Sequence, residues 1–321
     1  MRVSTLILTL AIVAALPLAG CRTNEATGRS QLIVLSAEQE ISLGEEAMPE
    51  LVKEYGGEVS DSVLREYVRD IGEEMAQHTE ADNPDLPWEF TLLDSDVINA
   101  FALPGGKVFM SRGLMTRMTN EAQLAGVLGH EIGHVTGRHV NDRIKDAMVL
   151  QAGVIGLTLG TRKSDNSLAR YTPLIVGVAG QGFLLKFSRD QESEADHLGM
   201  RYMARAGYHP RAQMQVMQIL DDAMKESGGG GGPEFLSTHP YPETRIARIR
   251  DDLRNIYSRA DGNPNLDYHD ERFQRIARPR LDAIEAEKRR AMGEENREEM
   301  LLAALLTQPQ MWCAHCRAAQ E

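Results

Sequence analysis

Apolar residues recur at helical spacing over much of the chain. Between residues 61 and 78 the apolar side chains fall on one face of a helix, namely Val63, Leu64, Tyr67, Val68 and Ile71. Capping residues, Pro210 and Gly207 mark where such stretches begin or end. The pattern predicts helices over residues 36–55, 61–78, 191–206, 210–225 and 243–257, and one more that begins at Asn120.

Strand patterns are few. The stretch WEFTLLD from Trp88 partly alternates, and NAFALPGGKVFMS, residues 99–111, reads as a strand, a Pro-Gly-Gly turn and a second strand. The sequence therefore predicts a mainly α fold (α+β) with one small sheet.

Two apolar, glycine-rich segments, residues 147–160 and 173–185, flank a polar stretch. Neither reaches the roughly 18 to 20 apolar residues that a membrane-spanning helix requires. We expect helices and a loop that pack over the helix following Asn120, in preference to a membrane hairpin. The five glycines of residues 228–232 form a flexible joint.

The amino-terminal residues have the pattern of a targeting segment. Arg2 precedes an apolar run, residues 5–19, which ends in LPLAGC at Cys21. This ending resembles the lipobox of bacterial lipoproteins, so we predict a signal peptide over residues 1–20, lipidation of Cys21 and a lipidated adaptor over 21–36. Arg22 after the cysteine favours an outer-membrane anchor facing the periplasm. The alternative is an ordinary secretory signal with a nearby cysteine.

The charge of the chain limits its partners. The formal net charge is −12 over 321 residues, and no basic patch suggests nucleic-acid binding. Residues 259–321 are charged and weakly patterned, so we expect a loosely packed tail. Near its end, Cys313 and Cys316 would form a disulfide in an oxidising periplasm, or a second zinc site with His315.

The stretch HEIGH carries the clearest chemistry. His130 and His134 are four residues apart, so a helix projects both imidazoles from one face, where a single zinc ion can bind them. Glu131 lies about 100° around the helix, close enough to hold a water molecule without being a ligand. His139 comes five residues after His134, about 140° off the ligand face of a continuous helix, and reads as a capping or solvent-facing residue.

A third ligand is available in SRDQESEADHLG, residues 188–199. Glu192 and Asp196 share one helix face, so Glu192 fits as a zinc ligand and Asp196 as the acceptor that orients a histidine. Glu194 should face away. The alternative is an exposed acidic helix with ordinary salt bridges.

Four motifs in order carry a resemblance to a known family: NAFALPGG, GVLGHEIGHVTGRH, FSRDQESEADHLG and STHPYPETRIARI. They resemble the zinc metallopeptidases that include the CaaX prenyl endopeptidases and membrane quality-control proteases, and in particular their periplasmic lipoprotein branch. The resemblance covers about residues 26–258. It implies a gluzincin, a zincin-like fold with an HExxH active-site helix, over residues 37–258.

The resemblance also implies a function. One zinc ion per chain would be bound by His130, His134 and Glu192, with Glu131 as general base. The substrates would be unfolded or misassembled envelope proteins, and the outer-membrane assembly machinery is a partner to expect. The transmembrane helices of many members and a helical-repeat domain are missing. A holdase that rarely cuts, or a lipoprotein whose zinc only supports the fold, are the alternatives.

Two further groups complete the expected site. The strand that contains Asn99, Ala100 and Phe101 would be an edge strand that pairs with substrate, or else an internal core strand. His239, in STHPYPETRI, would donate to the oxyanion of the reaction, with Arg245 fixing its loop or pairing with an active-site carboxylate. The other role open to His239 is that of an inhibitory zinc ligand.

Overall fold

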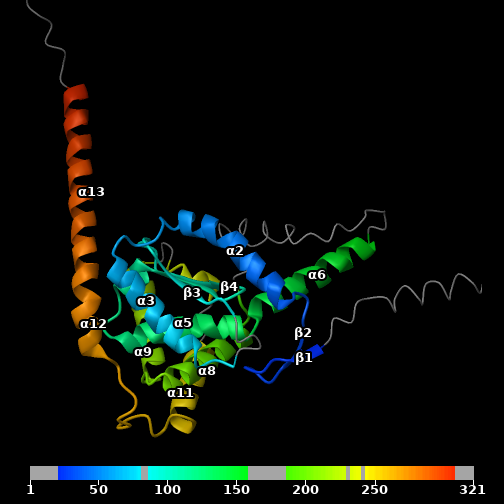
Figure 1. Cartoon of the computed structure of the whole chain (residues 1–321). Helices are drawn as coiled ribbons and strands as arrows, with labels where there is room; N and C mark the ends of the chain where they lie inside the picture. The colour runs from blue at the N-terminus through cyan, green and yellow to red at the C-terminus, as the bar shows by residue number, and fades with distance from the viewer. Residues whose placement is uncertain (1–20, 81–85, 158–185, 229–231, 240–242, 308–321) are drawn as a thin grey trace, which may run out of the picture.

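Helices form most of the protein, and a small three-stranded sheet lies among them (Figure 1). The structure is a computed structural model that describes residues 21–80, 86–157, 186–228, 232–239 and 243–307. The longer helices before the carboxyl-terminal region are α2 (Ala37–Glu54), α3 (Ser62–Ala76), α5 (Glu121–Thr136), α6 (His139–Leu157), α8 (Arg189–Arg205), α9 (Ala212–Glu226) and α11 (Glu243–Asn255). The mainly helical fold with a small sheet is confirmed.

The predicted helix starts at Ser36, Asp61 and Asn120 are confirmed, because each of these side chains makes a capping hydrogen bond. Ser36 before α2 and Ser188 before α8 each form a capping box with the glutamine three residues later. The side chain of Asn120 accepts from the backbone N–H of Gln123 at the start of α5. Gly207 ends α8 with a φ of +85°, which glycine adopts without strain.

The sheet has the strand order β3-β5-β4, built from β3 (Glu89–Leu93), β4 (Ala100–Leu103) and β5 (Lys107–Ser111). β3 is parallel to β5, and β4 is antiparallel to β5. β4 is therefore an edge strand, as one reading of the sequence predicts. The tight turn before β5 needs Gly105, since a Cβ there would lie 2.6 Å from the Cα of Ile41.

The contact between α5 and α8 positions the chemistry. Glycines face each other where the two helices cross, and a Cβ on Gly199 would lie 2.8 Å from the carbonyl carbon of Gly129. Side chains larger than hydrogen would push the helices apart. The close approach brings the face of α5 that carries His130 and His134 against the face of α8 that carries Glu192 and Asp196.

The amino-terminal segment is tied to the body. It forms a hairpin of β1 (Cys21–Thr23) and β2 (Ser30–Leu32). The side chains of Asn24 and Gln31 donate to the carbonyl oxygens of Thr136 and Gly137, both at 2.8 Å. The segment that we expected to be an adaptor thus caps the end of α5.

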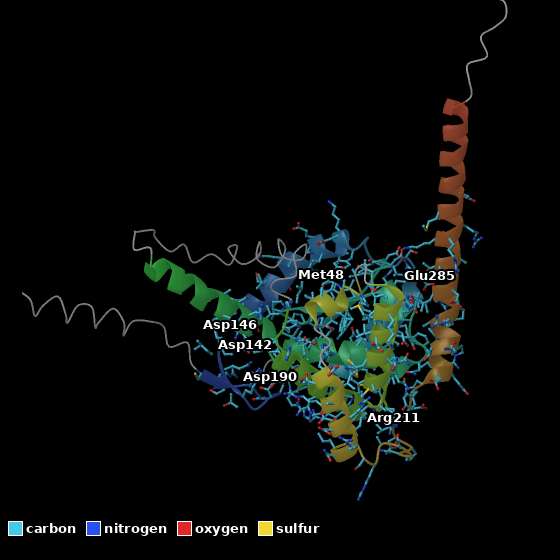
Figure 2. All side chains as sticks on the ribbon, turned by 180° about the vertical axis from the view of Figure 1, so that it is seen from behind. Met48, Asp142, Asp146, Asp190, Arg211 and Glu285 are labelled. Carbon is cyan, nitrogen blue, oxygen red and sulfur yellow. The ribbon has the colours of Figure 1, made fainter. Side chains whose placement is uncertain are left out.

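The described part of residues 259–321 packs on the core up to Leu281, where the expectation of a loosely packed tail is wrong, and is half-buried or exposed from residue 282 to 294. This part forms α12 (Asp270–Ile276) and α13 (Arg278–Thr307), and Phe273 and Leu281 are fully buried in the core. Glu285 of α13 pairs with the buried guanidinium of Arg112 at the start of the short helix α4 (Arg112–Met115) (Figure 2). The rest of α13 extends away from the body (Figure 1).

Among the described residues, no helix is both long and apolar enough to cross a membrane. The first apolar segment falls mostly in α6, which projects from the body (Figure 1). The predicted signal peptide, the second apolar segment and the cysteines at positions 313 and 316 lie outside the described residues.

Candidate metal centre

Four buried side chains converge where α5, α8 and the loop after α10 (Phe235–Thr238) meet. His130, His134, Glu192 and His239 each offer one ligand atom, and these atoms lie within 4.8 Å of one another. All four side chains are almost fully shielded from solvent. The structure therefore brings the three expected ligands together and adds His239 to them.

His130 is held from behind by Asp196. Its Nδ1 lies 2.9 Å from the Asp196 carboxylate, which accepts two further hydrogen bonds of 2.7 Å from the guanidinium of Arg245. Because the carboxylate accepts, Nδ1 carries a proton, which leaves Nε2, the ring nitrogen directed into the cluster, as the atom that would bind a metal ion. Of the two positions expected for Arg245, the structure shows the pairing with active-site carboxylates.

His134 is held from behind by His139, and the expectation of a capping or solvent-facing His139 is wrong. His139 is fully buried, with Nδ1 2.8 Å from Nδ1 of His134 and Nε2 3.0 Å from Glu194. The predicted position of His139 assumed that the helix continues past Gly137. Instead α5 ends at Thr136, and Arg138 has a φ of +52°, which turns the chain so that the His139 ring folds back.

The bonds of His139 also fix its proton. Burial lowers the pKa of His139, so the ring is neutral and carries one N–H. Glu194 accepts that N–H at Nε2, which leaves Nδ1 of His139 as an acceptor from His134. His134 therefore also presents an Nε2 lone pair to the cluster. Glu194 faces away from the cluster, as expected, but it contributes through this contact.

Nε2 of His130 and Nε2 of His134 lie 3.1 Å apart inside the cluster. The Glu192 carboxylate lies 3.4 Å from Nε2 of His134 and 3.5 Å from Nε2 of His130. Ligands bound at about 2.0–2.1 Å to one tetrahedral zinc ion lie roughly 3.3 Å apart. Donor set and spacing therefore both fit zinc.

The ionisation of the cluster fits a cation as well. Burial would lower the pKa of His130, but the charge of Asp196 outweighs it and raises that pKa to about 9. Burial would raise the pKa of Glu192, but the charges of His239 and Arg245 hold it well below its usual range. A metal ion would take the place of the proton that His130 otherwise attracts.

Glu131 lies in the cluster without a partner. Its side chain is fully buried, and neither carboxylate oxygen has a hydrogen-bond partner among the described residues. Burial raises its pKa. A desolvated carboxylate with two open acceptor positions is suited to take a proton from a bound water molecule.

His239 occupies a ligand position. Its Nδ1 lies 3.0 Å from Glu192 and 3.3 Å from Nε2 of His130, whereas its Nε2 lies 3.7 Å from Glu131. Its ring stacks on Phe235, and Phe187 stacks on His134. No separate signal in the sequence points to these two phenylalanines, since an apolar residue beside a motif is typical of ordinary core.

The strand residues expected to contact substrate are buried. The Phe101 ring packs against Phe109 and Tyr55, and Ala100 lies in the core, so neither side chain is exposed to a substrate. Asn99 donates through its amide nitrogen to Tyr55 and Glu234, whereas its side-chain oxygen has no partner among the described residues.

A buried HExxH helix packed against a second helix that supplies a glutamate defines an HExxH metallopeptidase. The sequence profile of peptidase family M48 matches residues 63–253, and the chain belongs to this family. The buried His/His/Glu/His cluster is typical of a zinc site in M48 peptidases.

Three relatives show how far the similarity extends. The beta-barrel assembly-enhancing protease of Escherichia coli (strain K12) is 33% identical over 228 residues, which are 70% of this chain and 45% of that protein. Its counterpart from Yersinia pestis is 31% identical over 254 residues, 78% of this chain and 50% of that protein. The mitochondrial metalloendopeptidase OMA1 of Schizosaccharomyces pombe is 33% identical over 167 residues, 52% of this chain and 47% of that protein. The chain thus spans about half the length of these relatives.

Proposed function

We propose that this protein is a zinc-dependent endopeptidase that hydrolyses unfolded or misassembled envelope proteins as part of protein quality control. The observation that carries the proposal is the convergence of Nε2 of His130, Nε2 of His134 and the Glu192 carboxylate at the spacing of zinc ligands, beside a Glu131 carboxylate that has no hydrogen-bond partner among the described residues. The relatives named beta-barrel assembly-enhancing protease support the choice of substrate.

The proposed reaction assigns a task to each residue. When bound by His130, His134 and Glu192, zinc would polarise the scissile carbonyl and lower the pKa of a water molecule. Glu131 accepts a proton from that water and passes it to the leaving nitrogen. His239 donates a hydrogen bond to the negative charge that develops on the carbonyl oxygen. In the present conformation its ring lies among the ligands, so substrate binding requires His239 to move aside.

Substrate would bind along β4. β4 pairs with β5 on one side, and no described strand pairs with its other side. An extended polypeptide can pair with such an edge through backbone hydrogen bonds, which tolerates many sequences. The backbones of Ala100 and Phe101 would contribute to this pairing, and the open side-chain oxygen of Asn99 would accept a substrate N–H.

Degradation of casein, an unfolded protein, tests the function. Zinc-loaded protein should yield fragments, a chelator should stop their appearance, and added zinc should restore it. Glu192→Ala should lose zinc and activity together, and stoichiometric zinc in that variant would show that the third ligand is misassigned. Suppressed aggregation of an unfolded protein without fragments would favour the holdase instead.

The location is proposed from the amino-terminal motif. Cys21 is exposed at the start of β1, and we propose that it carries a lipid that anchors the protein to the outer membrane, facing the periplasm. Cys21→Ser should release the protein from the membrane fraction, with its zinc content unchanged. Unchanged fractionation of this variant would exclude the anchor.

A further inference from the structure

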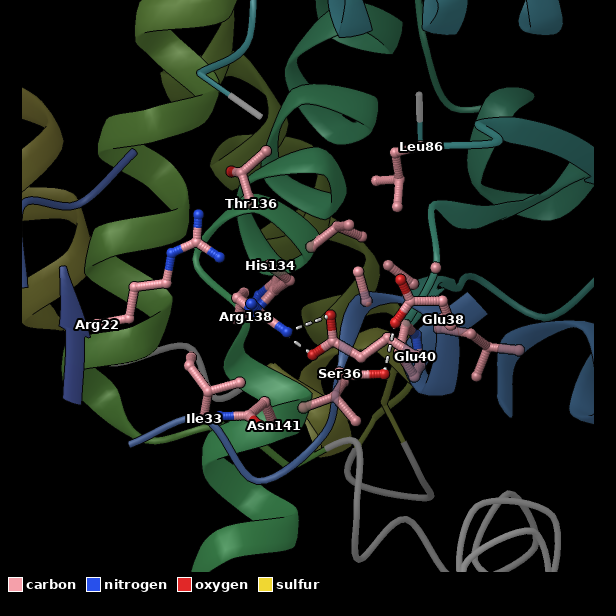
Figure 3. A pocket seen from close by; sticks show the side chains of 17 residues that line it. Arg22, Ile33, Ser36, Glu38, Glu40, Leu86, His134, Thr136, Arg138 and Asn141 are labelled. Carbon is pink, nitrogen blue, oxygen red and sulfur yellow. Dashed lines mark hydrogen bonds and ion pairs between the residues drawn. The ribbon is translucent and has the colours of Figure 1, made fainter. Parts of the chain in front are cut away.

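A cavity of about 320 Å³ opens directly beside the metal centre (Figure 3). His134 and the residues after it form one wall, and Ala102 and Leu103 of β4 form another. A cavity that is bounded by a metal ligand and by the proposed substrate strand lies where a bound polypeptide passes. Its volume is at the lower end of the range for ligand pockets, which suits a single side chain.

The third wall comes from the amino-terminal segment. Its side chains are those of Arg22, Ile33, Ser36, Ala37, Glu38 and Glu40, which we call the N-terminal wall (Figure 3). These residues precede the region that the family profile matches, which starts at residue 63. The profile alone therefore gives no reason to include them in the site.

The N-terminal wall is fixed to the turn after α5. The side-chain oxygen of Asn141 accepts from the backbone N–H groups of Val34 and Leu35, at 3.0 and 3.2 Å. The guanidinium of Arg138 donates to the carbonyl oxygen of Leu35 at 3.1 Å and pairs with Glu40 at 2.9 Å. These bonds hold the N-terminal wall in place. They also occupy the side-chain oxygen of Asn141 and the guanidinium of Arg138, which both line the pocket.

Much of what the pocket offers to a ligand is apolar. The charge of Arg138 is neutralised by Glu40, and Asn141 is occupied by backbone groups. The apolar part of the lining includes Ile33, Leu103 and Val140, whereas the charged side chains of Arg22 and Glu38 belong to exposed residues. An apolar side chain that contacts Ile33, Leu103 and Val140 gains free energy by leaving water.

We propose that the N-terminal wall is part of the substrate-binding site, where it closes a pocket for the apolar side chain of a substrate residue adjacent to the scissile bond. The proposal rests on the proposed function. In a polypeptide paired with β4, side chains alternate in direction, so one of them is directed to the pocket next to His134. The small side chain of Ala102 leaves the room for it.

Peptide cleavage by the full chain tests the proposal. Mapping the fragments of casein supplies one cleaved sequence, from which two peptide series are made, with Phe, Leu or Ala on either side of the scissile bond. In the series that varies the residue directed to the pocket, the wild type should prefer Phe and Leu over Ala. Ile33→Trp fills the pocket and should lower kcat/KM for the Phe peptide about tenfold or more, with less than a twofold change for the Ala peptide.

A matched control distinguishes filling of the pocket from the general effect of adding a large side chain. Ser30→Trp adds the same ring at an exposed position of β2 that does not line the pocket, and it should leave the Phe-to-Ala ratio unchanged. Ile33→Ala widens the pocket and should shift preference from Phe toward Trp, which keeps the test valid if the larger variant does not fold. An unchanged ratio in folded Ile33 variants, or equal losses for all peptides, would overturn the proposal.

Peptide binding distinguishes this proposal from the proposed function. Fluorescence anisotropy with zinc-loaded Glu131→Gln, with and without Ile33→Trp, measures the affinity for alanine-rich peptides that carry Phe or Ala at one central position, so it needs neither turnover nor a known cleavage site. If the wild type cleaves nothing, the peptidase function is wrong, but a Phe preference that Ile33→Trp removes would still support the pocket. Equal affinities in both backgrounds would refute the pocket even in an active enzyme.

Discussion

The two histidines of the HExxH motif are supported in different ways. His130 is backed by Asp196 and Arg245, which are both buried and are joined by two hydrogen bonds. His134 is backed by His139, which leads through Glu194 to Arg29, whose side chain is 42% exposed. One support is closed within the core, and the other ends at the surface.

The difference indicates which parts of the chain the zinc site needs. Asp196 and Arg245 lie within the region that the family profile matches, whereas Arg29 belongs to the amino-terminal segment. Charges buried without solvent depend fully on each other, whereas charges near water are screened. Changes on the His130 side should therefore be severe, and changes toward the surface on the His134 side should be graded.

The largest effect should follow Asp196→Ala. The change leaves the buried guanidinium of Arg245 without its main partner, and breaking such a pair costs about 3–5 kcal/mol of unfolding free energy. Zinc should also be lost, since His130 is no longer oriented. Urea unfolding and metal analysis measure both, with Asp196→Asn as the milder control. If Asp196→Ala kept wild-type stability and a full zinc content, the proposed difference between the supports of His130 and His134 would be wrong.

The His239 ring contacts both His130 and His134. His239→Ala should retain zinc, because His130, His134 and Glu192 remain to bind it. Loss of one donor to the developing oxyanion costs roughly 10²–10³ in rate, so casein degradation should fall by that factor. Increased degradation would identify His239 as an inhibitory fourth ligand. Unchanged degradation would leave it as only a turn residue.

His139→Ala should have an intermediate effect. Without the acceptor at Nδ1, the His134 ring loses its fixed tautomer, and zinc affinity should fall about 10–100-fold. Competition with a chelator measures the affinity, and His139→Gln, which can still accept a hydrogen bond, should recover part of it. Equal affinities for wild type and His139→Ala would show that the contact does not position His134.

Glu194→Gln should have the smallest effect, about 1 kcal/mol or less in stability. Burial raises the pKa of Glu194, but hydrogen bonds from His139 and Arg29 outweigh it and lower the pKa. The ionised form is therefore favoured in the folded state, and its contribution is present above the unfolded pKa and lost as pH falls through the lower folded pKa. The stability difference between the two proteins should begin to shrink as the pH falls to the unfolded pKa of about 4.3, and it should disappear only below the lower folded pKa. A difference that grows toward acid pH would reverse this assignment.

Spacing within helices made much of the site predictable. His130 and His134, and likewise Glu192 and Asp196, are four residues apart, so each pair shares a helix face whatever the rest of the fold does. The starts of three predicted helices followed from local capping residues, namely Ser36, Asp61 and Asn120. These features depend on neighbours in sequence, which is why they can be read without a structure.

Other parts depended on where the chain turns. His139 was misplaced because a left-handed Arg138 cannot be foreseen from a residue type that rarely adopts it. The amino-terminal segment packs through single buried amides such as Gln31, which leave no periodic signal. The tail did carry a signal, since Phe273, Ala277 and Leu281 recur every four residues, but the surrounding charges obscured it.

The central claim is that His130, His134 and Glu192 bind a zinc ion on which Glu131 acts only as a base. The measurement that tests it most directly is the zinc content of purified Glu131→Gln beside its rate of casein degradation. The account predicts one zinc per chain and a rate at least about 100-fold below that of the wild type. Near-wild-type degradation by the zinc-loaded variant would contradict the role of Glu131, and loss of zinc would contradict the assignment of the ligands.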